Sequence, residues 1–361
     1  MQSVILAAGN STRTYPLTLT KPKPLLKIAN RTVLEYNLEA VKDTGDEIII
    51  VVGYKKDMLK DFIQKNYPQL KIKFVEQKEQ LGTGNAVSIL EKHIKNRFIL
   101  FMGDNICSRK DVNEIANDQY AILVKKVKNP EFFGVVIEKN SILADIIEKP
   151  KKFASDSVNC ALYSLDKKIF DILKKTEKSE RGEYELTEAI KLISANEKVY
   201  CVKSASCLLI TRPWYLLNAD KELRRNKNII GKNSKIQGKQ SFLVYKKSKG
   251  FLYICGNVKN SSIGDNCVII GTIKNSIIMG NTIIDKGSIV EDSIIGENVY
   301  FKGTIIAKNN IYSNVRNKKI RVDRLGAVIS DNVKAENVII NAGCKIWPNK
   351  KIKGEIDHDI G

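Results

Sequence analysis

Apolar and polar residues follow one pattern in the first part of the chain and a different pattern in the last part. In the first part, short apolar runs rich in β-branched residues alternate with segments whose apolar residues recur at helical spacing. This alternation predicts a mainly parallel sheet covered by helices, as in an α/β domain. The predicted strands cover residues 4–8, 47–52, 72–75, 98–102, 120–126, 135–138 and 199–202, and the predicted helices lie near 33–41, 57–66, 85–94 and 213–226.

Near residue 228 the pattern changes to a period of six. The recurring apolar positions are Ile277, Ile283, Ile289, Ile295 and Phe301, and then Ile340, Ile346 and Ile352. A period of six fits neither an α-helix nor a simple strand, but it fits a solenoid in which each six-residue segment forms one face of a prism. An ordinary β-rich domain with many isoleucines is the alternative.

The segment with this period resembles the hexapeptide-repeat, left-handed parallel β-helix family. Residues 307–325 interrupt the period and carry many charges, so we expect an inserted loop there. The predicted domains are therefore a Rossmann-like α/β domain over residues 1–228 and a β-helix over residues 229–361.

Length and composition agree with two folded domains and exclude a disordered chain, because 43% of the 361 residues are hydrophobic and 28% are charged. The 60 lysines and arginines against 40 aspartates and glutamates give a formal charge of +20, which raises the possibility of nucleic-acid binding. The basic residues are scattered, however, and no basic tract is interleaved with aromatic residues for base stacking. We therefore expect no nucleic-acid partner, and the positive charge would instead attract small anionic substrates.

The apolar runs are too short to span a bilayer, and the first residues lack the features of a secretory signal. The chain has seven cysteines, none in a CxxC pair, and only two histidines, His93 and His358, which disfavours a zinc site. We expect buried, reduced thiols in a cytoplasmic protein without membrane association.

The first predicted strand ends in a turn of small residues, Gly9-Asn10-Ser11-Thr12-Arg13, and the segment continues to Lys21-Pro22-Lys23-Pro24-Leu25. A turn of this kind lets backbone N–H groups approach a polyanion, and Arg13 and Lys23 add positive charge. The complete string from Leu6 to Leu26 resembles the signature of the sugar-1-phosphate nucleotidylyltransferases. The resemblance implies that Leu6, Ala8 and Gly9 line the nucleotide site, and that Arg13 and Lys23 are catalytic residues on the phosphates.

Residues 76–86, EQKEQLGTGNA, are similar to the uracil-recognition segment of the UDP-N-acetylglucosamine pyrophosphorylases. The similarity implies that Gln77, Gly82 and Thr83 read the pyrimidine edge, which an amide side chain can do because it both donates and accepts hydrogen bonds. Without this context, Gln77 would be interpreted as an exposed residue at a strand end.

An apolar strand closes on Gly103-Asp104-Asn105, and a carboxylate at the C-terminal end of a strand lies where α/β sheets bind ligands. The family resemblance implies that Asp104 holds Mg²⁺ together with substrate phosphate oxygens. A structural role for Asp104 in capping the loop is the alternative.

Further segments resemble the sugar-binding elements of the same family. By this resemblance, Gly134 lies against the sugar, Glu148 accepts hydrogen bonds from its hydroxyls, Lys149 meets the sugar phosphate, and Asn159 also binds the sugar. Residues 182–190, GEYELTEAI, resemble another segment at the sugar end of the cleft.

Three positions or segments depart from the family pattern. Ser11 stands where many relatives have glycine, which is a mild change if its φ is negative, and Leu209 stands where many have an aspartate that can be a second Mg²⁺ ligand. In the bifunctional relatives a histidine of the β-helix is the general base for acetyl transfer, but no histidine occurs here between residues 229 and 357. We expect that acetyltransferase activity is lost, that His358 lies on a mobile tail, and that the β-helix serves assembly into a trimer-based homo-oligomer.

The resulting functional hypothesis is the synthesis of an NDP-sugar and pyrophosphate from an NTP and a sugar-1-phosphate, with UTP and N-acetylglucosamine-1-phosphate as the favoured pair. Three alternatives remain open. They are an enzyme that uses glucose-1-phosphate with UTP or dTTP, a bifunctional enzyme that also acetylates glucosamine-1-phosphate, and a non-catalytic regulatory subunit.

Overall fold

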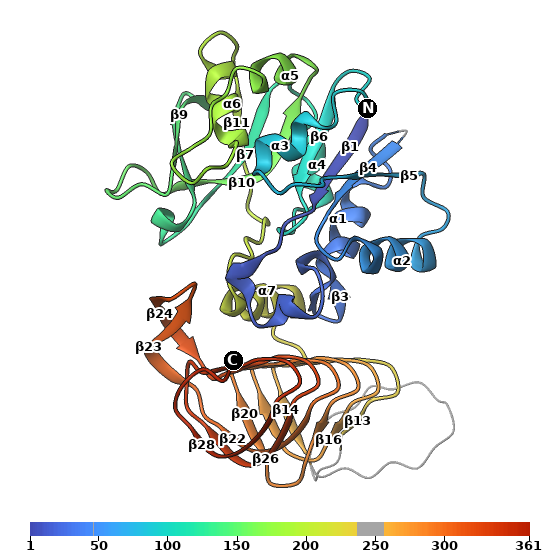
Figure 1. Ribbon diagram of the computed structural model, residues 1–361, viewed down its shortest axis with the longest axis vertical. Helices are drawn as coiled ribbons and strands as arrows, with labels where there is room; N and C mark the ends of the chain where they lie inside the picture. Colours follow the sequence, from blue (N-terminus) through green and yellow to red (C-terminus); the bar gives the residue numbers. More distant parts are fainter. Residues whose placement is uncertain (46, 237–255) are drawn as a thin grey trace. The chain divides into compact units, whose positions relative to one another are not determined.

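The computed structural model describes residues 1–45, 47–236 and 256–361. It divides into two compact units (Figure 1). The sheet unit comprises residues 1–10 and 33–209, and the solenoid unit comprises residues 11–32 and 210–361. The predicted boundary between residues 228 and 229 lies inside the solenoid unit and stays a prediction.

The sheet unit contains a nine-stranded sheet with the order β5-β4-β1-β6-β10-β7-β11-β9-β8. Strands β5, β4, β1 and β6 are parallel, as predicted, whereas β10 runs antiparallel to both β6 and β7, and β8 and β9 form an antiparallel pair. The sheet is therefore mixed beyond β6. Its strands are β1 (Gln2–Ala7), β4 (Glu47–Val52), β5 (Ile72–Glu76), β6 (Phe98–Met102), β7 (Ala121–Lys126), β8 (Gly134–Lys139), β9 (Ile142–Glu148), β10 (Ser157–Leu165) and β11 (Tyr200–Lys203).

Helices complete the sheet unit, and the central strand β1 is buried along its whole length because its apolar side chains are covered on both faces. The predicted helix near 85–94 is shorter than expected: it ends at Ser88, and residues beyond it form turns that still bury Leu90 and Ile94. The helices are α1 (Val33–Val41), α2 (Lys56–Asn66), α3 (Thr83–Ser88), α4 (Arg109–Ile115), α5 (Lys168–Leu173) and α6 (Leu186–Ser194), with the 3-10 turn η4 (Pro130–Phe132).

The largest part of the solenoid unit is a parallel β-helix, whose short strands pair with those of the next coil in three columns (Figure 1). The strand β22 spans two of the columns, as do β26 and β28. The strands are β12 (Ile229–Ile230), β13 (Lys235–Ile236), β14 (Asn257–Lys259), β15 (Ser262–Ile263), β16 (Val268–Ile269), β17 (Thr272–Lys274), β18 (Ile277–Ile278), β19 (Ile283–Ile284), β20 (Ile289–Glu291), β21 (Ile294–Ile295), β22 (Tyr300–Ile305), β25 (Val328–Ile329), β26 (Lys334–Ile340), β27 (Lys345–Ile346) and β28 (Lys351–Ile356).

The inward-facing residues recur at steps of six at Ile278, Ile284 and Val290, but the next step, to Ile295, is five, so the predicted positions before Ile295 are one residue out of phase with the core. Ile284 and Val290 are completely buried, whereas the preceding Ile283 and Ile289 are 39% and 37% exposed. In a strand, neighbouring side chains point to opposite faces, so only one residue of each apolar pair can enter the core. The prediction that named Ile283 and Ile289 as the repeating positions is therefore wrong for these two pairs, because the following residue of each pair enters the core.

The predicted inserted loop at 307–325 is a β-hairpin of β23 (Lys308–Val315) and β24 (Lys318–Leu325). The rest of the solenoid unit consists of η1 (Thr12–Thr14), η2 (Leu17–Leu19), η3 (Lys23–Leu25), β2 (Lys27–Ile28), β3 (Arg31–Thr32) and α7 (Pro213–Arg224).

Helix α7 connects the early residues to the β-helix through one buried carboxylate. Asp220 forms an ion pair with Arg224, accepts a hydrogen bond from the backbone N–H of Ala29 (2.9 Å), and accepts another from Ser262 Oγ (2.6 Å). Because a buried carboxylate needs such partners to offset its desolvation, Asp220 holds together three segments that are distant in the sequence.

No helix within the described ranges is long and apolar enough to cross a membrane. The six described cysteines are buried and free, which confirms that part of the prediction, and Cys255 lies outside the described residues. Burial raises the pKa of Cys267 and of Cys344 to about 11.

We predict that Ile284→Ala lowers the free energy of unfolding by about 3 kcal/mol, because it leaves a cavity between the stacked coils. The neighbouring variant Ile283→Ala removes the same atoms from an exposed side chain and should cost less than about 1 kcal/mol. Urea unfolding followed by circular dichroism measures both. Equal losses in the two variants would contradict the assigned inward face.

Candidate active site

The C-terminal ends of four parallel strands form one edge of the sheet and bring several predicted residues into register. The N–H of Gly103 donates to the carbonyl of Leu6 (2.8 Å), and the N–H of Gln77 donates to the carbonyl of Val52 (2.9 Å). Leu6 and Ala8 are buried, and Gly9 is exposed just beyond β1. The edge is where parallel sheets bind ligands, as the sequence predicted.

The side chain of Gln77 is buried, so the interpretation as an exposed strand-end residue is wrong. Its Nε2 donates to Asn85 Oδ1 (2.8 Å) and to the carbonyl of Gly82 (3.2 Å). These hydrogen bonds fix the orientation of the amide and engage its nitrogen, which leaves Oε1 as the atom that can accept a hydrogen bond from a ligand.

Gly82 connects this segment to a second motif far along the chain. Its φ is +103°, and a Cβ atom there would lie 2.6 Å from the carbonyl oxygen of Tyr184, so only glycine fits. The N–H of Gly84 donates to the same carbonyl (2.7 Å), and the N–H of Leu186 donates to Thr83 Oγ1 (3.0 Å). The structure thus brings together the segments 76–86 and 182–190, which sequence reasoning treated separately.

Asp104 lies two residues beyond the end of β6, after Gly103, and is half-buried. Two residues later, Ile106 pairs with Leu208 in an antiparallel bridge, so Leu209 lies beside the turn that carries Asp104. No group of three His, Cys, Asp or Glu side chains able to hold a metal ion occurs in the described parts of the chain. A single carboxylate still fits Mg²⁺, since this ion is commonly held by one or two carboxylates together with substrate phosphates.

Three of the predicted sugar-binding residues lie together where β8 pairs with β9 and with β10. Gly134 is directly opposite Glu148, and a Cβ atom at position 134 would lie 3.0 Å from Glu148 Oε2 and 3.8 Å from Asn159 Cβ. Asn159 Nδ2 donates to the hydroxyl of Tyr163 (2.6 Å), and burial raises the pKa of this tyrosine. The absence of a side chain at Gly134 therefore leaves space beside two polar groups.

A pocket of about 600 Å³ adjoins Glu148 and Lys149. Lys149 Nζ lies 2.7 Å from Glu148 Oε1, and Arg181 Nη2 lies 2.7 Å from Glu185 Oε1 and 3.5 Å from Glu148 Oε1. Burial raises the pKa of Glu185, and the nearby Arg181 opposes this effect. Sequence reasoning missed Arg181, although it stands directly before the recognised segment 182–190.

Arg13 and Lys23 belong to the solenoid unit, within residues 11–32, which we call the phosphate loop. Arg13 is exposed on η1, whereas the Lys23 side chain is buried on η3. Ser11 has a φ of +51°. Serine in place of glycine was expected to be a mild change only if this φ were negative, so the change is not mild at this position. Its carbonyl accepts hydrogen bonds from the Thr14 N–H (3.0 Å) and from Thr18 Oγ1 (2.9 Å), which hold this conformation.

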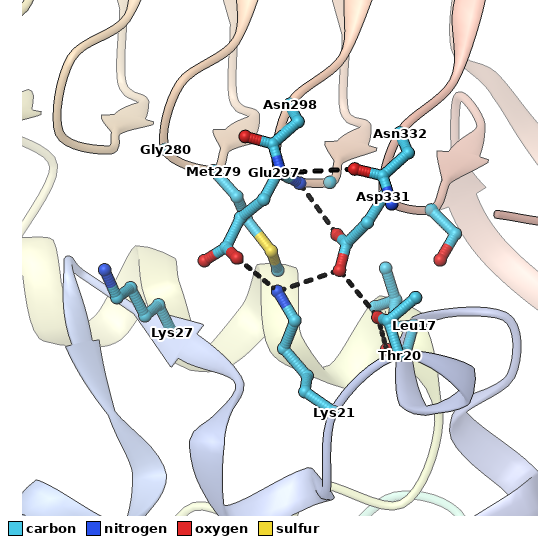
Figure 2. A network of polar contacts seen from close by, with 12 residues as sticks. Leu17, Thr20, Lys21, Lys27, Met279, Gly280, Glu297, Asn298, Asp331 and Asn332 are labelled. Atoms are coloured by element: carbon cyan, nitrogen blue, oxygen red, sulfur yellow. Dashed lines mark hydrogen bonds and ion pairs between the residues drawn. The ribbon is translucent and has the colours of Figure 1, made fainter. Parts of the chain in front are cut away.

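The phosphate loop is attached to corner turns of the β-helix (Figure 2). Lys21 Nζ lies 2.8 Å from Glu297 Oε2 and 3.0 Å from Asp331 Oδ2, and Thr20 Oγ1 donates to the same Asp331 oxygen (2.6 Å). Farther along the loop, Asn30 Nδ2 donates to the carbonyl of Ile263 (2.6 Å). These contacts join residues about 230 to 310 positions apart, so the sequence pattern did not reveal them.

Comparison with known proteins agrees with this arrangement. The family described as "Nucleotidyl transferase" matches residues 2–208, and the family described as "GMPPB C-terminal domain" matches residues 255–360. The chain is 36% identical to the "Bifunctional protein GlmU" of Methanocaldococcus jannaschii, over all of this chain and 96% of that protein. The chain belongs to the nucleotidyl transferase family.

Two further proteins are similar to this chain to different extents. The "Bifunctional sugar-1-phosphate nucleotidylyltransferase/acetyltransferase" of Sulfurisphaera tokodaii is 33% identical over all of this chain and 98% of its own length. A solved "UDP-glucose pyrophosphorylase complexed with UDP-glucose" has a TM-score of 0.57 and 20% identity, covering 62% of this chain and 98% of that one, which shows a shared fold. The protein is accordingly an enzyme of the nucleotidyltransferase class.

We predict that Gly82→Ala lowers the free energy of unfolding by about 3 kcal/mol, because alanine disfavours the positive φ and its Cβ would collide with the Tyr184 carbonyl. Gly182→Ala is the matched control, because Gly182 also has a positive φ (+74°) but no atom within 4 Å of an added Cβ. Thermal and urea unfolding measure the difference. If Gly82→Ala lowered the free energy of unfolding no more than Gly182→Ala does, the close approach of residue 82 to the Tyr184 carbonyl would be contradicted.

Proposed function

We propose that the protein is a sugar-1-phosphate nucleotidylyltransferase that uses UTP and N-acetylglucosamine-1-phosphate. The observation that carries this proposal is the direct hydrogen bonding between residues 82–84 and residues 184–186, which links the predicted base-reading segment to the motif beside the pocket. This pocket contains Glu148 and Lys149, which are suited to sugar hydroxyls and a sugar phosphate.

In the proposed reaction an oxygen of the sugar phosphate attacks the α-phosphorus of the NTP. The new P–O bond forms as the bond between the α-phosphorus and the oxygen that bridges to the β-phosphorus breaks, and pyrophosphate leaves. The nucleophile is already an anion and needs no general base, so catalysis consists of positioning two polyanions and offsetting their repulsion.

We assign each charged side chain to one part of the two substrates or to the metal ion. Arg13 holds the β- and γ-phosphates and stabilises the leaving pyrophosphate, and Lys23 neutralises the α-phosphate. Lys149 receives the sugar phosphate, which competes with Glu148 for the ammonium group. Asp104 would hold Mg²⁺ with phosphate oxygens, and the bound ion supplies further charge neutralisation.

The uridine preference is supported by the orientation of Gln77, whose carbonyl oxygen can accept a hydrogen bond from N3–H of uracil, whereas cytosine has no hydrogen at N3. Glucose-1-phosphate with UTP is the second candidate, because a relative from Haloferax volcanii, 34% identical over 54% of this chain and 83% of its own length, is described as "UTP--glucose-1-phosphate uridylyltransferase AglF". A non-catalytic role is disfavoured because Arg13, Lys23 and Asp104 are all present.

The test is pyrophosphate release with Mg²⁺ over a grid of UTP, dTTP, CTP, ATP and GTP against glucose-1-phosphate and N-acetylglucosamine-1-phosphate. Release with UTP and N-acetylglucosamine-1-phosphate supports the proposal. Release with another pair would show that the protein is a nucleotidylyltransferase with different substrates from those proposed. Absence of release from every pair would support the non-catalytic alternative.

We predict that Arg13→Ala and Asp104→Ala each lower kcat by about 100-fold or more, on the scale of lost electrostatic stabilisation of the transition state. Asp61→Ala removes an exposed carboxylate from α2 and serves as the control. Steady-state pyrophosphate release measures all three. Turnover near that of the wild type in either test variant would remove that residue from the mechanism.

We further propose that acetyl transfer is lost and that the β-helix supports assembly into a trimer-based homo-oligomer. His358 is exposed and bonded to Asp357, and Ile360, two residues later, forms a bridge with Ile346, in place of the mobile tail expected from the sequence. Since no histidine occurs between residues 229 and 357, the protein should not acetylate glucosamine-1-phosphate with acetyl-CoA in a thiol-release assay. Thiol release that depends on the amino sugar would instead support the bifunctional alternative.

A further inference from the structure

The hairpin β23–β24 interrupts the repeat of the β-helix, and its place in the solenoid unit is fixed by specific contacts (Figure 1). Ser313 Oγ donates to the carbonyl of Gly343 (2.9 Å), and Arg324 forms ion pairs with Asp292 (2.9 Å) and Glu291 (3.6 Å). Apolar side chains from both strands are buried as well. The hairpin therefore presents its tip in a defined position.

The tip is a two-residue turn, Arg316-Asn317, between the paired residues Val315 and Lys318. Both central residues have positive φ, +49° and +60°. Turns of this kind favour Asn, Asp or Gly at both positions, and an arginine at the first position is held against backbone strain. A strained backbone that persists at a loop tip calls for a role of the side chain.

The Arg316 side chain reaches the phosphate loop. Its Nε donates to Thr12 Oγ1 (2.5 Å), and Thr12 precedes Arg13. The other solenoid anchors of this loop begin at Pro16, whose carbonyl accepts from Ser330 Oγ (3.0 Å), and continue through Thr20 and Lys21. Arg316 thus fixes the segment on the N-terminal side of those anchors, which is the segment that carries Arg13.

We propose that Arg316 is a positioning residue for nucleotidyl transfer, which holds Thr12 so that Arg13 is preorganised for the phosphates and which adds positive charge beside them. The guanidinium uses Nε for Thr12, and its other N–H donors suit a phosphate oxygen. This inference rests on the proposed function, because the anion in question is the triphosphate or the pyrophosphate product.

The test compares Arg316→Gln, Arg316→Lys and Arg316→Gly with the matched control Arg321→Gln. Arg321 lies on the same hairpin, is exposed, and bonds to Asn310 within the hairpin, so its replacement causes the same change in charge without touching Thr12. In pyrophosphate-release kinetics, Arg316→Gln should raise the KM for the NTP about tenfold with kcat within about threefold. Arg316→Lys should restore part of the loss, and the control should stay within twofold of the wild type.

Arg316→Gly separates a catalytic contribution from a purely structural one. Glycine relieves the strain at positive φ, so the thermal midpoint should stay equal or rise, while the KM for the NTP rises as in Arg316→Gln. An unchanged KM in Arg316→Gln and Arg316→Gly, or an equal change in Arg321→Gln, would overturn the proposal.

Amide hydrogen exchange of the free protein tests the positioning without relying on turnover. The N–H groups of Thr14 and Tyr15 donate to the carbonyls of Ser11 and Thr12, and their exchange should be at least about fivefold faster in Arg316→Gln than in the wild type or Arg321→Gln. Equal exchange in all three overturns the positioning. If the wild type releases no pyrophosphate from any pair, the proposed function fails, and this exchange result still decides whether Arg316 holds the loop.

Discussion

The placement of the phosphate loop depends on one buried ammonium group. Lys21 lies between the carboxylates of Glu297 and Asp331, and the side chains of Lys21 and Asp331 are 9% and 7% exposed. Removing one partner of a buried ion pair leaves an uncompensated charge, which is strongly destabilising, so the loop and the β-helix corner are fixed as one structure. Because Arg13 and Lys23 are on this loop, the solenoid determines the conformation of residues that act on the nucleotide in the proposed mechanism.

This constraint gives the β-helix a role beyond assembly. Its coils stack in three parallel columns, so each coil depends mainly on its neighbours. The phosphate loop contacts turns of several coils, from Ile263 to Asp331, and the inserted hairpin adds Thr12 to this series. Loss of order in any of these coils would therefore remove its contact with the phosphate loop. The stability of the solenoid is in this way linked to the conformation of the residues proposed to act in nucleotidyl transfer.

Local patterns in the sequence predicted the strands β1, β4, β5, β6, β7, β8 and β11 and the repeat of the solenoid, because strand alternation and repeat spacing are imposed by neighbouring residues. They did not predict β9 or β10. The segments around the candidate site were indicated by their resemblance to the nucleotidylyltransferases and not by these patterns. Local patterns could not predict the pairing of Lys21 with Asp331 or of Gly82 with Tyr184, because such contacts depend on how distant segments pack. The predicted phase was wrong at Ile283, because Ile283 and Ile284 are equally apolar and a local pattern does not distinguish them, whereas in the structure Ile284 enters the core.

The proposed reaction joins a nucleotide to a sugar phosphate by reversible exchange of a P–O bond. Phosphorus NMR of the purified protein with UDP-N-acetylglucosamine, pyrophosphate and Mg²⁺ tests it most directly, because each phosphorus species is observed separately. We expect UTP and N-acetylglucosamine-1-phosphate to appear as pyrophosphate disappears, without formation of orthophosphate. Unchanged spectra, or orthophosphate as the product, would contradict it.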